Sequence, residues 1–350
     1  MSPAGAALVS GLVVLGMVVV LPLGLRLLGP DVVPAPRSAA WPLAGVAGAA
    51  GVVLPHGTAS VLLALVFAAA TAVLAGAGAR LAARTLREVR ARRATRADRS
   101  AVARLASRAA TVTALVMPAV GASALVAERA GWGLLGFSGT YLALTVPHML
   151  YAGFGAALIA GAVARLGTDR LAVAGAWGVP LGTVLVLVGY FVGDVAELVG
   201  AGVLTLALWA TAVATVRSFA RPTGPAEPGG AQPDGRRPGD DRREPADRRL
   251  PDGRGDTAVA RVLLGTGATL VGPSMLLALW WAAGEALGFA HPSLDVMAAT
   301  HGVANALGFV LCTILGLRIL ARGPSASDEA DGAGRGTSRG PGRAPEGSRS

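Results

Sequence analysis

Long apolar runs separated by short polar breaks dominate this sequence of 350 residues. A helix rises about 1.5 Å per residue and the hydrocarbon core of a bilayer is about 30 Å thick, so about 20 apolar residues can span it. The run near Pro42 is the weakest, because it is short and rich in Gly. The pattern predicts an all-α polytopic transmembrane bundle of about nine helices. The predicted helices cover residues 5–27, 39–55, 58–79, 109–127, 140–164, 171–192, 195–216, 258–284 and 296–318.

Three polar segments interrupt this pattern. The first is rich in Arg and helix formers, with no Pro or Gly, and predicts a basic helical connector. The other two mix Pro, Gly, Arg and Asp, cannot bury a core, and predict disorder. The expected organisation is therefore three N-terminal helices (1–79), a basic cytoplasmic connector (80–108), helices four to seven (109–217), a disordered cytoplasmic linker (218–257), helices eight and nine (258–320), and a disordered cytoplasmic tail (321–350).

Composition excludes a soluble protein, since 53% of residues are hydrophobic and only 15% are charged. The formal net charge is +10, and every basic residue except the four histidines is Arg. We expect no nucleic-acid partner, because these arginines lie in loops, where the preference for positive charge on the cytoplasmic side explains them. Their distribution places the N-terminus outside and the C-terminus in the cytoplasm. Arg129 is then the only arginine in an outer loop.

Among the polar residues within the predicted helices, five stand out as candidate site residues, and all five lie in the outer halves: His148, Tyr151, Glu197, His301 and Asn305. Ionisable groups inside membranes are costly and often mark ion or solute pathways. We therefore expect them to form a substrate or proton site. The structural alternative is that they only join helices through hydrogen bonds, each worth about 1 kcal/mol, and that an acid at a helix start only complements the helix dipole.

Glycines near these residues predict close helix packing. Gly153 and Gly155 follow His148 on one helix, and Gly302 and Gly308 follow His301 on another. We expect His301 and Asn305 to face His148 and Tyr151 across a helix–helix contact. The remaining histidines, His56 and His291, fall in or beside outer loops and should be solvated.

Three segments resemble the YndJ-like family of bacterial integral membrane proteins: residues 131–161, 195–209 and 297–320. The likeness covers roughly residues 109–320 and includes the elements H-x-x-Y-A-G-F and T-H-G-x-x-N-A-x-G-F, in that order. The family pattern has a second histidine directly before the tyrosine, where this sequence has Leu150, which counts against a metal site. The resemblance implies a bacterial cell (inner or plasma) membrane protein, and family members are often labelled transporters. The matching residues are His148, Tyr151, Gly153, Phe154, His301, Gly302, Asn305, Gly308 and Phe309.

Three functions stay open. The first is a transporter or permease for a small polar solute, with a site lined by His, Asn and Glu in the outer half. The second is a haem- or metal-binding redox protein that uses His148 and His301 as ligands. The third is a non-catalytic accessory membrane protein.

Soluble-enzyme motifs such as the P-loop are absent, so no enzyme activity and no cofactor are expected. Cys312 is the only cysteine, which excludes a disulfide within the chain. The lipid bilayer and an unidentified solute are the expected partners, and the oligomeric state stays open.

Overall fold

The computed structural model describes residues 1–91, 99–166, 169–220 and 253–322. Helices make up nearly all of this part of the chain, and its only extended pairing is an isolated bridge between Leu134 and Phe137. Three of the long helices contain π-helical stretches, labelled η, in which the helix widens. The elements are α1 (Pro3–Leu15), η1 (Gly16–Val20), α2 (Leu21–Leu25), α3 (Ala40–Val53), α4 (Thr58–Ala91), α5 (Arg99–Arg129), α6 (Thr140–His148), η2 (Met149–Gly155), α7 (Ala156–Arg165), α8 (Arg170–Val192), α9 (Asp194–Ala220), α10 (Gly253–Leu287), α11 (Leu294–Met297), η3 (Ala298–Gly302), η4 (Ala304–Leu311) and α12 (Cys312–Ala321).

The prediction of an all-α transmembrane bundle is confirmed. Within the described residues, eight helices are long and apolar enough to cross a bilayer, and each coincides with a predicted run. The ninth, α3, has 14 residues and is therefore only about 21 Å long. Its glycines pack closely on neighbouring helices: a Cβ at Gly45 would lie 2.2 Å from the carbonyl oxygen of Met17. This helix is thus part of the bundle although it is shorter than the bilayer core.

The predicted polar segments lie at the ends of long helices. Helix α4 runs on to Ala91 and α5 begins at Arg99, so most of the predicted basic connector continues these two helices. The predicted linker and tail lie for the most part in 221–252 and 323–350, which are outside the described residues.

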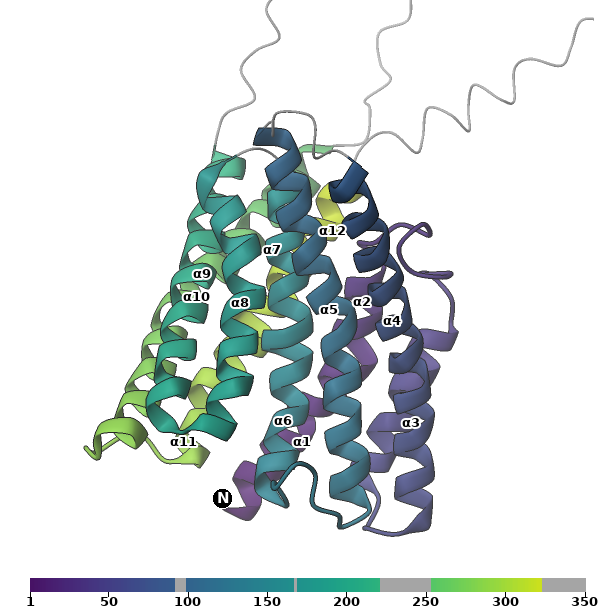
Figure 1. Ribbon diagram of the computed structural model, residues 1–350, viewed down its shortest axis with the longest axis vertical. Helices are drawn as coiled ribbons and strands as arrows, with labels where there is room; N and C mark the ends of the chain where they lie inside the picture. Colours follow the sequence, from purple (N-terminus) through teal and green to yellow (C-terminus); the bar gives the residue numbers. More distant parts are fainter. Residues whose placement is uncertain (92–98, 167–168, 221–252, 323–350) are drawn as a thin grey trace, which may run out of the picture.

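The chain packs as a series of antiparallel neighbours around a central helix (Figure 1). The closest pairs are α4 with α5, α8 with α9, and α9 with α10. At the centre lies α7, in which every residue from Ala156 to Ala164 is buried. Small residues dominate this segment, and they let helices approach closely in lipid, where packing rather than water exclusion holds them together.

The N-terminal helix is not peripheral. Helix α1 contacts α6, α11 and η3, so it lies beside both helices that carry the histidine motifs. Its start is fixed by Ser2, whose backbone amide and hydroxyl both donate to the carboxylate of Asp295 at 3.0 Å. A Cβ at Gly5 would lie 1.9 Å from the same carboxylate, so this contact requires glycine.

The N-terminus and helix α12 lie toward opposite ends of the bundle (Figure 1). Arg26, Arg37, Arg318 and Arg322 line one cavity at the α12 end, which we call the arginine-rich end. Its identification as the cytoplasmic end stays a prediction, made from the preference for positive charge on that side.

Candidate functional site

The two histidine motifs coincide with π-helical segments. The H-x-x-Y-A-G-F element ends in η2, and the T-H-G-x-x-N-A-x-G-F element lies across η3 and η4. A third segment, η1, interrupts the first helix. Such segments are rare, and they occur frequently at functional sites because they displace side chains and backbone carbonyls from helical register. Segments η1, η2 and η4 contact one another, so the three distortions meet inside the bundle.

His301 is held by a hydrogen-bond network between two helices. Its Nδ1 lies 2.8 Å from the carbonyl oxygen of Ser274 on α10 and 3.1 Å from the Ser274 hydroxyl. Its Nε2 lies 3.1 Å from the amide nitrogen of Asn305, one turn further along its own helix. Because a carbonyl only accepts, Nδ1 carries the proton; because the amide nitrogen only donates, Nε2 accepts. The ring is therefore neutral in this arrangement.

The same network leaves one polar atom without a partner. The side-chain oxygen of Asn305 is buried and has no hydrogen bond in the described part of the chain. Ser274 is also buried, with 2% of its surface exposed, and it follows Pro273 within α10. In lipid a buried amide oxygen without a donor is costly, so this atom is the feature of the network that packing does not explain.

His148 is exposed at the end of α6, and its Nδ1 donates to the carbonyl of Leu144 at 2.6 Å. Its Nε2 has no protein partner among the described residues. The helices that carry the two histidines touch where Gly155 of η2 meets Val310 of η4. No direct hydrogen bond joins His148 to His301 within the described residues, and the expectation that the two rings face each other stays a prediction.

The sequence led us to expect Tyr151 to face His301 and Asn305, but its hydroxyl makes its hydrogen bond to the N-terminal helix instead. Its hydroxyl donates to the carbonyl of Leu12 on α1 at 2.8 Å, and only 6% of the residue is exposed. The Leu12 side chain lies 3.4 Å from the position of a Cβ at Gly302. Helix α1 is thus placed between the two motif helices at this level, which the sequence reading did not foresee.

Glu197 belongs to a different part of the bundle. It lies near the start of α9, within electrostatic range of Asp194 and Glu285. The backbone of this turn packs on α8, since a Cβ at Gly189 would lie 2.5 Å from the Cα of Glu197. Among the described residues, no hydrogen bond or ion pair joins this carboxylate to His148 or His301, and its acidic neighbours are Asp194 and Glu285.

Each motif glycine permits a close approach by a different neighbour. A Cβ at Gly155 would lie 2.5 Å from Val310, and this contact joins η2 directly to η4. A Cβ at Gly153 would lie 2.6 Å from Met117 on α5, and one at Gly308 would lie 2.4 Å from Leu270 on α10. Leu150, at the position where the family pattern has histidine, is buried and packs on Gly16 of η1.

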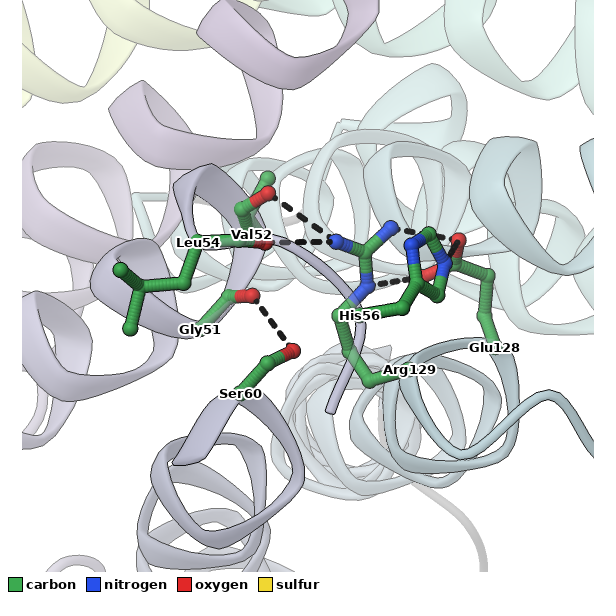
Figure 2. Close-up of polar contacts among 7 residues, drawn as sticks. All are labelled: Gly51, Val52, Leu54, His56, Ser60, Glu128 and Arg129. Atoms are coloured by element: carbon green, nitrogen blue, oxygen red, sulfur yellow. Dashed lines mark hydrogen bonds and ion pairs between the residues drawn. The ribbon is translucent and has the colours of Figure 1, made fainter. Parts of the chain in front are cut away.

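A second polar cluster, at the end opposite the arginine-rich end, was also missed. Figure 2 shows Arg129 at the end of α5, where its guanidinium pairs with Glu128 and donates to the carbonyl of Val52 at 3.1 Å. His56 approaches Glu128 from the α3–α4 loop, with its Nε2 3.0 Å from the carboxylate. Glu128 and Arg129 have only 11% and 13% of their side chains exposed. The one arginine predicted on the outer side is therefore neutralised by a neighbouring acid and bound to backbone carbonyls.

The loop histidines are less free than expected. His56 is 60% exposed yet paired with Glu128, and the His291 side chain is 27% exposed with its Nε2 3.1 Å from Glu285. The His291 ring also stacks edge-on against Trp281. Spacing in the sequence gave no sign of these pairs, because each joins a loop residue to the end of a helix.

Ligation of a metal or haem by His301 would require one of its present hydrogen bonds to break, since both ring nitrogens are engaged. The described residues contain no group of three His, Cys, Asp or Glu side chains placed to hold a metal ion. The structure therefore adds no observation that favours the redox alternative.

Comparison with known proteins agrees with the family expected from the motifs. The sequence model of the family described as YndJ-like protein matches residues 11–227 and 249–309. The match includes the end of α1, from Gly11 onward, and so begins well before residue 109, where the likeness expected from the motifs begins. No curated protein and no solved structure matches this chain. Because the match covers well over half of the sequence, the chain belongs to the YndJ-like family, as a multi-pass helical membrane protein.

Proposed function

We propose that this protein is a transporter or permease for a small polar solute, with its binding site at His301 and Asn305 and with His148 beside it. The observation that carries the proposal is the buried Asn305 oxygen, which has no partner within the described residues although it adjoins a fully hydrogen-bonded histidine. A hydroxyl or amine of a solute would satisfy this oxygen. Asn305 belongs to η4, which contacts the distorted segments η1 and η2, and such segments are frequent at functional sites.

The network also suggests coupling to a proton. In the neutral state the Asn305 amide donates to Nε2 of His301. If His301 took up a proton, both ring nitrogens would become donors, and the favourable response would be rotation of the Asn305 amide so that its oxygen accepts from Nε2. Protonation would then withdraw the acceptor that we propose for the solute. Solute and proton would thus compete for one oxygen atom.

His148 is exposed, and its Nε2 has no partner within the described residues, so it is suited to a first contact with a solute or proton. Tyr151 would act through position rather than contact, because its hydroxyl holds α1 against the η2 segment. Glu197, which groups with Asp194 and Glu285, would influence the approach of charged solutes at the outer end. We place the protein in the bacterial plasma membrane, and transport requires no covalent step, so we expect no enzyme activity.

The proposal can be tested with the full chain reconstituted in liposomes on a solid-supported membrane. Amino acids, sugars, polyols and small carboxylic acids would be applied in turn, and the transient current recorded at several pH values. We expect one solute class to give a current that Asn305→Leu abolishes. His301→Gln should leave a stable protein whose response no longer varies with pH, because Gln can hydrogen bond but cannot titrate.

The matched control is Thr300→Val, adjacent to His301 in sequence. The Thr300 hydroxyl is exposed and donates only to the carbonyl of Val296 in its own helix, at 2.6 Å. This variant should behave as the natural protein does. A solute current that Asn305→Leu leaves intact would contradict the proposed site. The absence of any current, together with loss of stability in both site variants, would favour an accessory protein in which the network only holds helices together.

A further inference from the structure

Four arginines from two separate parts of the chain line one cavity. Arg26 directly follows α2 and Arg37 lies in the α2–α3 loop, whereas Arg318 and Arg322 lie one turn apart at the end of α12. The cavity has a volume of about 490 Å³, and among the described residues Leu27 and Ala321 also line it. Arginines about 290 positions apart in sequence therefore place positive charge around the same cavity.

No acidic side chain compensates these charges within the described residues, in contrast to Arg129, which pairs with Glu128, and Arg108, which pairs with Glu88. Arg318 lies within electrostatic range of the other three guanidiniums. Like charges four residues apart on a helix repel, so Arg318 and Arg322 would destabilise the end of α12 without a counter-charge. The attraction of basic residues to a helix C-terminus explains these two residues but not Arg26 and Arg37.

The loop that carries Arg37 is fixed in place, so the cavity is formed in advance. Leu28 and Val33 are buried, with 6% and 0% of their surfaces exposed. The indole nitrogen of Trp41 donates to the carbonyl of Ala35 at 3.1 Å, and Arg84 on α4 donates to the carbonyl of Asp31 at 3.4 Å. Because the backbone that carries Arg37 is already ordered, anion binding would not have to order this loop, which lowers the entropy cost of binding.

We propose that Arg26, Arg37, Arg318 and Arg322 form a binding pocket for a phosphate group, occupied by the headgroup of an anionic phospholipid of the cytoplasmic leaflet. Guanidinium groups bind phosphate oxygens in bidentate geometry. Basic pockets between transmembrane helices on the cytoplasmic side are suited to anionic headgroups. The cavity lies at the arginine-rich end and is bordered by Leu27, and its volume is large enough for a glycerophosphate group. This pocket is separate from the proposed solute site, and the two proposals stand or fall independently.

The test is native mass spectrometry of the purified full chain in mild detergent, titrated with phosphatidylglycerol or phosphatidylcholine carrying identical acyl chains. We expect one phosphatidylglycerol to bind well above the level seen for phosphatidylcholine. Since each basic residue near a membrane surface contributes a several-fold gain in affinity for an anionic lipid, Arg26→Gln/Arg318→Gln should weaken this binding by about 10-fold or more. The control is Arg80→Gln/Arg87→Gln, which removes the same charge from α4 outside the cavity.

Equal losses in the two double variants would overturn the pocket, because they would show binding by overall charge alone. Millimolar inorganic phosphate added before the lipid separates the two sources of the phosphate group. Displacement of phosphatidylglycerol by phosphate would overturn a lipid ligand in favour of a free phosphate ion or ester, and no displacement would support the lipid.

If the double variant fails to fold, Arg322→Gln replaces it and is compared with Arg87→Gln, because both side chains are exposed. The Arg322 change should then lower affinity several-fold while the Arg87 change does not.

Discussion

The hydroxyl of Tyr151 donates to the carbonyl of Leu12 across 139 positions of sequence, and this bond fixes the first helix of the chain against the segment that carries the first histidine motif. Leu12 also borders Gly302 in the second motif. One residue of α1 therefore lies next to both motifs, which makes the N-terminal helix part of the candidate site.

The Tyr151 hydrogen bond should contribute measurably to stability. Tyr151→Phe removes the donor and leaves the Leu12 carbonyl without this partner, so we expect a loss of about 1 kcal/mol in the free energy of unfolding. Thermal unfolding of the purified protein in detergent would report it as a lowered Tm. Tyr141→Phe is the control, because Tyr141 is exposed and its hydroxyl has no hydrogen-bond partner among the described residues. Equal Tm values for the two variants would show that the Tyr151 bond is not formed.

The contact between η2 and η4 depends on Gly155. A side chain there would collide with Val310, so Gly155→Ala should lower the Tm by several degrees. Truncation of the opposing residue should relieve this collision: the double variant Gly155→Ala/Val310→Ala should be more stable than the sum of the two single changes predicts. Additive effects in this double-mutant cycle would mean that the two segments do not touch.

The cluster at Glu128 should behave as a partly buried ion pair (Figure 2). Glu128→Gln leaves the guanidinium of Arg129 without its carboxylate, and we expect a loss of about 2 kcal/mol in unfolding free energy. Glu128→Gln/Arg129→Gln should be less damaging than Glu128→Gln alone, since no unpaired charge is left. His56→Gln should have a small effect, because this side chain is 60% exposed. A double variant that is less stable than Glu128→Gln would refute the pairing.

The orientation of the bundle is open to direct measurement. Reporter fusions after residue 220 and after residue 322 should report the cytoplasm, and a fusion at residue 133, in the α5–α6 loop, should report the outside. The reason is that the cavity-lining arginines gather at one end, whereas Arg129 at the other end is neutralised. Identical readings at residues 133 and 220 would place both ends of the bundle on one side and refute this topology.

The number and position of the long helices could be predicted from the sequence because the thickness of the bilayer sets their length. The weak helix at residues 39–55 was predicted too, and it is the short helix α3. Which faces meet could not be predicted, because helices that are apolar all round carry no amphipathic pattern to orient them. The hydrogen bond between Tyr151 and the carbonyl of Leu12 could therefore not be predicted. Every residue has a backbone carbonyl, and only the fold determines which one meets a donor.

The candidate site was predictable only as a set of residue types. His301 and Asn305 are hydrogen bonded to each other, as their spacing of four residues implies. Ser274 was missed because it lies on a different helix, beside Pro273, and the sequence does not show that its hydroxyl and carbonyl meet His301. Glu197 was grouped with the histidines by depth alone, and depth does not specify on which side of a bundle a residue lies. Its position on α9 places it beside Asp194 and Glu285 instead.

The central claim is that the two histidine motifs meet in one site, and cysteine cross-linking in native membranes tests it most directly. His148 and His301 would be replaced by Cys in a Cys312→Ser background and treated with a short bifunctional thiol reagent. The positive control is Ser2→Cys/Asp295→Cys, whose natural side chains lie 3.0 Å apart at the N-terminal ends of α1 and α11. The negative control is His56→Cys/His301→Cys. We expect residues 148 and 301 to cross-link in good yield. Failure of this pair to cross-link, while the Ser2 and Asp295 positions do, would contradict the claim.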